Sequence, residues 1–183
     1  YYSLQLQNKK LNHYNNHMGL LINKKWEDKW YDTKGNKGQF VRQDSRFRNQ
    51  IGTAEFPAET GRYHLFMSSA CPWAHRTVIY RKLKQCEHII TLSEVNPVML
   101  KNGWEFNQPA DSLLNKNYLY ELYLIADPHY EGRVTVPVLW DKKKETIVNN
   151  ESSDIIRMIN SQFNELTGDK QDFYPTDLQQ EID

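Results

Sequence analysis

Alternating strand and helix signals along residues 62–159 constrain the fold of this chain more than any other feature. Short runs rich in β-branched and aromatic residues alternate with segments whose apolar residues recur at helical spacing. In chain order, the sequence predicts a strand at 62–68, a helix at 72–84, a strand at 89–95, a helix at 119–126, strands at 134–140 and 145–148, and a helix around 155–159.

This β-α-β-α-β-β-α order determines the expected topology. Two strands joined by a helical crossover form a parallel pair, whereas the last two strands, separated only by the charged turn 141–144, form a hairpin. We therefore expect a thioredoxin-like α/β domain over residues 61–161.

The flanking segments lack this pattern. Residues 1–17 are rich in Asn, Gln and Tyr and predict a polar tail without the apolar core of a secretory signal. Residues 18–60 mix aromatic and charged side chains, which predicts an irregular N-terminal extension lying on a neighbouring surface. Residues 162–183 predict a linker and the start of a further segment.

Charge and cysteine content exclude several functions. The 23 Lys and Arg residues balance 23 Asp and Glu residues, so the basic surplus of a general nucleic-acid binder is absent. The apolar stretches are strand-sized, and we expect a soluble protein with no membrane association. Two cysteines cannot form a disulfide framework, which favours a reducing, cytoplasmic location and makes each thiol a candidate for chemistry.

One thiol lies where a helix favours an anion. Cys71 stands between the first strand and the first helix and is followed by Pro72 and Trp73. Unpaired backbone N–H groups and the positive end of the helix dipole stabilise a thiolate there, and Pro72 costs little in the first turn. We expect Cys71 to be a nucleophile; the alternative is a buried, inert cysteine.

A second thiol is missing from the position where a dithiol site has one. Ala74 occupies that position, and Cys86 lies beyond a helix whose rise of about 1.5 Å per residue puts it roughly 20 Å away. We interpret Cys86 as structural. A monothiol site must take its second thiol from solution, and glutathione is the abundant candidate.

Pro137 interrupts an otherwise good strand. In a thioredoxin-like fold this residue would follow a cis Val136–Pro137 bond and leave the Val136 main chain available to an extended, peptide-like ligand. The alternative is an edge strand with a trans proline.

Residues 150–154 open the last helix with capping and acidic side chains, which is sufficient as a structural explanation. The functional alternative is that Ser152 and nearby N–H groups hold a carboxylate while Glu151 holds an ammonium group. Those two charges match the zwitterionic end of a γ-glutamyl group.

Other polar residues of the first helix are expected to face solvent. They are His75, with proton transfer as its alternative role, and Arg76, Arg81 and Lys82. A Cys71–His75 metal pair is disfavoured because zinc sites need four ligands, and we expect no metal.

Several segments resemble glutathionyl-hydroquinone reductases, the Xi class of glutathione transferases. They are residues 40–49, 69–76, 95–106, 126–141 and 150–158, within a resemblance that extends from Met18 to Asp183. The resemblance implies that Cys71 attacks the sulfur of a glutathionyl-hydroquinone, releases the hydroquinone and forms a mixed disulfide with glutathione. A second glutathione then resolves this disulfide to oxidised glutathione.

The resemblance also implies roles for individual residues. Trp104 would lie against glutathione, Arg133 would contact it, Val136 beside cis Pro137 would pair with its cysteinyl main chain, and Glu151 with Ser152 would hold the γ-glutamyl end. Family members continue into an all-helical C-terminal domain that supplies the hydroquinone pocket and much of a homodimer interface, which we interpret as absent from this chain.

Two alternative functions remain open from the sequence. One is a general thiol transferase or dehydroascorbate reductase resembling the omega class. The other is a noncatalytic glutathione-binding module, which predicts an exposed apolar face on the helix at 119–126 or at 155–159.

Overall fold

The computed structural model describes residues 19–29 and 44–183. The expected polar tail at 1–17 lies outside the described residues, as do residues 18 and 30–43 of the expected extension. No helix in the described part of the chain is long and apolar enough to cross a membrane.

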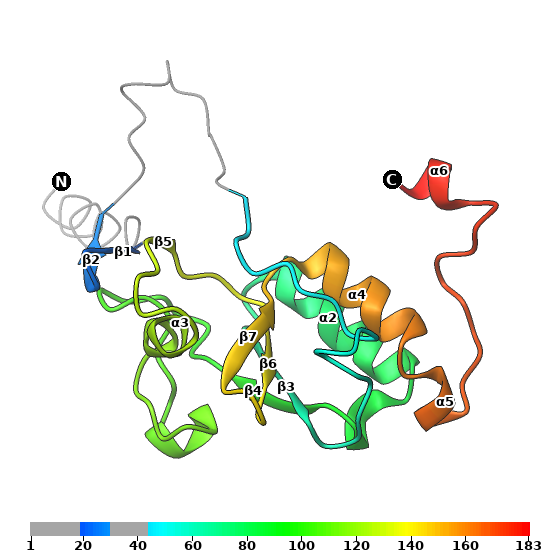
Figure 1. Ribbon diagram of the computed structural model, residues 1–183. Coiled ribbons are helices and arrows are strands. Elements are labelled where there is room, and N and C mark those ends of the chain that lie inside the picture. Colours follow the sequence, from blue (N-terminus) through cyan, green and yellow to red (C-terminus); the bar gives the residue numbers. More distant parts are fainter. Residues whose placement is uncertain (1–18, 30–43) are drawn as a thin grey trace, which may run out of the picture.

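A four-stranded sheet forms the centre of the molecule (Figure 1). Strand β3 is parallel to β4 and antiparallel to β6, and β6 pairs with β7 in an antiparallel hairpin. This topology confirms the expected thioredoxin-like arrangement. Across the sheet the strands are β4 (Thr91–Glu94), β3 (Tyr63–Met67), β6 (Val138–Asp141) and β7 (Thr146–Asn149).

Three helices cover the two faces of this sheet. Helices α2 (Pro72–Leu83) and α4 (Ser152–Ser161) lie together on one face, and α3 (Leu119–Ala126) lies on the other (Figure 1). Successive strand residues point to opposite faces. Leu65 and Leu139 therefore join the core beneath α4, whereas Phe66 and Trp140 join the core beneath α3.

The apolar stripes of α3 and α4 are buried in these two cores. Leu122 and Ile155 are both fully inaccessible to solvent. The exposed apolar face expected for a noncatalytic module is therefore not found on either helix. The exposed apolar side chains lie elsewhere: Ile125 on α3 lies outside the buried stripe and is 38% exposed, and Ile79 and Leu83 on α2 are each nearly half exposed.

The expectation of an irregular extension is wrong for its first described part. Strands β1 (Gly19–Ile22) and β2 (Lys25–Asp28) form a hairpin, and β1 also pairs with β5 (Gly132–Arg133). Asn23 and Lys24 both have positive φ angles, as a tight two-residue hairpin turn requires. Strands of four residues are too short for their alternation to stand out in the sequence.

Aromatic side chains attach the extension to the domain, as expected. The Trp26 ring stacks on Tyr120 with a centroid separation of 5.4 Å, and its indole N–H donates to the Lys101 carbonyl at 2.8 Å. This ring lies so close to Gly103 that a Cβ atom there would collide with it. Phe47 similarly contacts Tyr123 and Tyr130.

Residues after α4 pack back on the helical face. They include two short helices, α5 (Asn164–Thr167) and α6 (Gln179–Ile182), and two 3₁₀ turns lie earlier, at η1 (Cys86–His88) and η2 (Pro109–Ser112). Lys84 is almost fully buried against this segment, with its Nζ 3.7 Å from the Asp169 carboxylate. The division into a domain and a linker at residue 161 stays a prediction.

A buried ion pair joins the start of β3 to the end of β6. The Arg62 guanidinium donates to the Asp141 carboxylate at 2.9 Å through Nε, and the Asp141 side chain is fully buried. The same carboxylate accepts the backbone N–H of Lys143 in the β6–β7 turn. The ion pair lowers the pKa of Asp141 against the opposing effect of burial.

We expect Asp141→Ala to lower the free energy of unfolding by about 3 to 5 kcal/mol, because it leaves the Arg62 guanidinium buried without its carboxylate. Urea denaturation measures the loss. Lys143→Ala removes only the exposed Lys143–Glu59 pair and should leave the midpoint almost unchanged. Equal midpoints for both variants would contradict this account of the pair.

A second buried group makes the fold sensitive to acid. His64 lies opposite Trp140 across β3 and β6 and is 3 % exposed, and burial lowers its pKa to about 4. In the unfolded chain, the His64 imidazole has the ordinary histidine pKa of about 6.5. Below that pH the unfolded state therefore holds more protons, and stability falls as pH decreases from 6.5 towards 4.

Across this pH range, the difference between the two His64 pKa values lowers the free energy of unfolding by about 3 kcal/mol. We expect His64→Gln to flatten the fall in unfolding free energy between pH 7 and pH 4.5, measured by urea denaturation at each pH. A variant with the same slope as the parent protein would show that His64 is not the responsible group.

Candidate active site

Cys71 occupies the N-cap of α2, as the sequence predicts. Pro72 is the first helical residue, and the backbone N–H of His75 donates to the Cys71 carbonyl at 2.9 Å. The Cys71 thiol is free and half-buried, and it lies 3.7 Å from the carbonyl oxygen of Val136. The helix start therefore presents one thiol beside the segment that precedes β6.

The other thiol is in a different environment. Cys86 is fully buried, and burial raises its pKa to about 11, so this thiol stays protonated near neutral pH. Its Sγ lies 3.4 Å from the Lys84 carbonyl oxygen. These properties agree with a structural role for Cys86.

Ala74 is fully buried within the first turn of α2, and His75 is exposed as expected. Among residues 19–29 and 44–183, no three His, Cys, Asp or Glu side chains are grouped so that they could hold a metal ion.

The Val136–Pro137 peptide bond is cis, which confirms that prediction. The strand expected at 134–140 begins only at Val138, however. The main chain of Thr135 bonds to a side chain instead of a neighbouring strand: its N–H donates to the Tyr123 hydroxyl at 3.2 Å, and its carbonyl accepts from that hydroxyl at 2.8 Å.

Tyr123 links this segment to the start of α4. Its hydroxyl also accepts a hydrogen bond of 3.2 Å from the Asn150 side chain, and burial raises the pKa of the phenol. The sequence places Tyr123 in the apolar stripe of α3 and gives no signal of this role. Through this one hydroxyl, the residues before Pro137 and the residues before Glu151 are held together.

Glu151 is the N-cap of α4. Its carboxylate accepts from the Ser153 backbone N–H at 3.4 Å and from the Ser45 hydroxyl at 3.1 Å. The adjacent Ser152 hydroxyl accepts from the Arg76 guanidinium at 2.7 Å. The two residues predicted to hold a γ-glutamyl group thus have an arginine beside them at the start of a helix.

The expectation that Arg76 is a solvated residue is wrong. Arg76 lies over the Trp73 ring, 5.0 Å from its centroid, and connects α2 with Ser152 on α4. Arg81 is also not simply solvated, because it donates to the carbonyls of Glu87 and Ile90. Lys82 is exposed, as expected.

Trp104 and Arg133 are the two remaining residues with a predicted contact to glutathione. Trp104 is half-buried and packs, like Cys71, at the edge of the core beneath α3. Arg133 lies in β5 opposite Leu20 of the hairpin, and burial lowers the pKa of its guanidinium.

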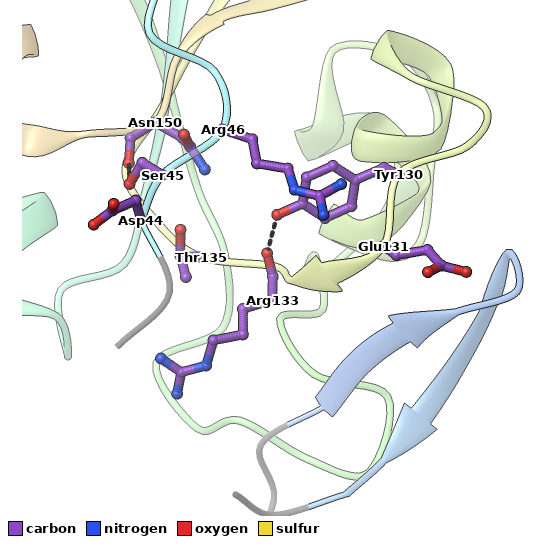
Figure 2. A pocket seen from close by; sticks show the side chains of 8 residues that line it. All are labelled: Asp44, Ser45, Arg46, Tyr130, Glu131, Arg133, Thr135 and Asn150. Carbon is purple, nitrogen blue, oxygen red and sulfur yellow. Dashed lines mark hydrogen bonds between the residues drawn. The ribbon is translucent and has the colours of Figure 1, made fainter. Parts of the chain in front are cut away.

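Arg133 also lines a cavity of about 390 Å³ between the extension and the domain (Figure 2). Figure 2 shows Arg46 lying across the Tyr130 ring, with Arg133 extending in another direction. The cavity shares only Arg133 with the predicted site, since Cys71, Glu151 and Ser152 are not among its lining residues. Those residues are Asp44, Ser45, Arg46, Tyr130, Glu131, Arg133, Thr135 and Asn150.

Comparison with known proteins shows which family this chain is similar to. Residues 70–162 match the family model "Glutathione S-transferase, N-terminal domain". The chain is 54% identical over 180 residues to glutathionyl-hydroquinone reductase YqjG of Escherichia coli (strain K12), a match that covers 91% of this chain and 55% of that protein. It thus spans about half the length of this curated relative.

Comparison with solved structures points to the same family. The crystal structure of the glutathione S-transferase Xi from Phanerochaete chrysosporium superposes with a TM-score of 0.73 at 50% identity, covering 78% of this chain and 52% of that one. The glutathione-bound structure of Escherichia coli YqjG gives a TM-score of 0.70 at 55% identity, covering 74% of this chain and 49% of that one. The chain therefore belongs to the glutathione S-transferase family, with residues 70–162 as its N-terminal domain and the family's Xi class as the class that it resembles.

Proposed function

We propose that this chain carries the glutathione site and the reactive thiol of a glutathione-dependent reductase that removes glutathione from glutathionyl-hydroquinones. The observation that carries the proposal is the free Cys71 thiol at the N-cap of α2, 3.7 Å from the Val136 carbonyl oxygen, with Ala74 where a dithiol enzyme has its second sulfur. The relatives named as glutathionyl-hydroquinone reductase and as glutathione-bound transferase support it.

The chemistry follows from a single thiol. The Cys71 thiolate attacks the sulfur of the glutathionyl-hydroquinone, an S–S bond forms and the bond from sulfur to the ring carbon breaks. The ring carbon keeps the electron pair and takes a proton, which releases the hydroquinone. A glutathione thiolate then attacks the mixed disulfide, so oxidised glutathione leaves and Cys71 returns as thiolate. The ring is reduced by two electrons, and two glutathione sulfurs are oxidised.

The surrounding residues bind the glutathionyl group. Its cysteinyl main chain pairs with Val136 beside Pro137, which brings its sulfur to Cys71. Its γ-glutamyl carboxylate lies at the N-terminus of α4 with Ser152 and Arg76, where backbone N–H groups and a guanidinium favour an anion. Glu151 accepts from the ammonium group. Trp104 and Arg133 contact the remainder of the ligand, and Pro72 and Trp73 support the thiol.

The first test compares the two cysteines. Incubated with a glutathionyl-hydroquinone and glutathione, the Cys86→Ser variant should retain turnover because Cys86 is buried and protonated. The Cys71→Ser variant should lose at least 100-fold, as expected for loss of an enzyme's nucleophile. Release of hydroquinone is measured by chromatography. Equal turnover by the parent and Cys71→Ser proteins would refute the assignment.

A second test defines the substrate class. Rates on a glutathionyl-hydroquinone and on a mixed disulfide of glutathione with a small thiol are compared for the same preparation. We expect the hydroquinone conjugate to be preferred in kcat/KM. A preference for the mixed disulfide would instead indicate a general thiol transferase, and ligand binding without turnover of either substrate would indicate a binding module.

A further inference from the structure

Residues 44–49 of the N-terminal extension run beside the start of α4, outside the part of the chain that matches the family model. Figure 1 shows this segment in cyan, passing close to the start of α4. The backbone N–H of Asn49 donates to the Val148 carbonyl at 3.0 Å, and that of Asn150 donates to the Phe47 carbonyl at 3.1 Å. The segment therefore adds backbone pairing to the end of β7, immediately before Glu151.

Side chains fix the segment in this register. Arg48 forms two hydrogen bonds with the Asp154 carboxylate in the first turn of α4, at 2.5 and 3.0 Å. The Phe47 ring packs between Tyr123 and Tyr130, with centroid separations of 5.7 and 5.6 Å. An ion pair on one side and an aromatic contact on the other leave the backbone at Ser45 little freedom to move away from α4.

The Ser45 hydroxyl of the extension is a hydrogen-bond donor to the Glu151 carboxylate. The Ser45 hydroxyl lies 3.1 Å from Glu151 Oε2 and 3.5 Å from the Asn150 carbonyl, so the carboxylate is the nearer acceptor. Glu151 Oε1 accepts from residues of α4: from the Ser153 backbone N–H and hydroxyl, each at 3.4 Å, and from the Ser152 hydroxyl at 3.5 Å. The extension thus donates to one carboxylate oxygen and the helix to the other.

A glutamate side chain has several rotatable bonds, and ordering it when a ligand binds reduces affinity. Donors that already hold the carboxylate remove part of this cost. We propose that Ser45 is a positioning residue for the γ-glutamyl ammonium subsite: it holds Glu151 Oε2 in the orientation that receives the ammonium group. This inference rests on the proposed function, in which Glu151 binds that group.

The experiment measures glutathione affinity of the full 183-residue chain by isothermal titration calorimetry. We expect Ser45→Ala to raise Kd roughly five- to tenfold, the range for losing a hydrogen bond to a charged group. Ser45→Thr, which keeps the hydroxyl, should bind as the parent does. Thr53→Ala is the matched control, because Thr53 lies in the same extension and bonds only within its own turn, to Gln50 and Phe56.

Two further measurements separate positioning from general damage. The rate of Cys71 alkylation by iodoacetamide should be unchanged in Ser45→Ala, because the thiol lies on another element. In a Glu151→Gln background, Ser45→Ala should add less than a twofold change, because both substitutions act on the same subsite.

The outcomes distinguish the two claims. If Glu151→Gln weakens binding and Ser45→Ala does not, the positioning role of Ser45 is wrong and the proposed subsite stands. Full additivity of the two substitutions also overturns the positioning role. If Glu151→Gln binds glutathione as the parent does, the proposed γ-glutamyl subsite is wrong, and the role of Ser45 falls with it.

Discussion

The buried hydroxyl of Tyr123 is the interaction on which the rest of the site depends. It bonds to both backbone groups of Thr135 and to the Asn150 side chain, and all of these partners lie next to proposed ligand-binding residues. Thr135 precedes Val136, and Asn150 precedes Glu151. Losing this hydroxyl would leave buried donors and an acceptor without partners, which is costly in a low-dielectric interior. One helix of the core thereby sets the separation between the two parts of the site.

The thiol and the charged subsite come from the two helices on the face of the sheet opposite to α3. Helices α2 and α4 pack together there, so the N-terminus of α2 brings Cys71 towards Val136, and Arg76 on α2 reaches Ser152 on α4. The extension completes the arrangement, because Asn150 bonds to Phe47 as well as to Tyr123. A site made from two helix starts and a proline segment is thus held by contacts among four separate parts of the chain.

The sequence predicts those parts of the structure that depend on interactions between residues close together in the chain. The strand and helix order, the N-cap position of Cys71 and the cis Val136–Pro137 bond were all predictable, because each depends on neighbouring residues or on a fold with a fixed position for proline. The hairpin at 19–28 was missed because its strands are very short. Arg76 and Ser152 are 76 positions apart in the sequence, and Ser45 and Glu151 are 106 positions apart. A local sequence pattern cannot predict hydrogen bonds between residues so far apart. The roles assigned to Trp104 and Arg133 come from resemblance alone, those of Glu151 and Ser152 come from the helix start and from resemblance, and all four stay predictions.

In the proposed reaction Cys71 itself accepts the glutathionyl group. The most direct measurement is a single turnover: the protein is mixed with one equivalent of glutathionyl-hydroquinone without free glutathione, quenched in acid and digested for mass spectrometry. We expect one glutathionyl group on the peptide that contains Cys71, with an equal amount of hydroquinone released. Hydroquinone released without that adduct, or an adduct on Cys86, would contradict it.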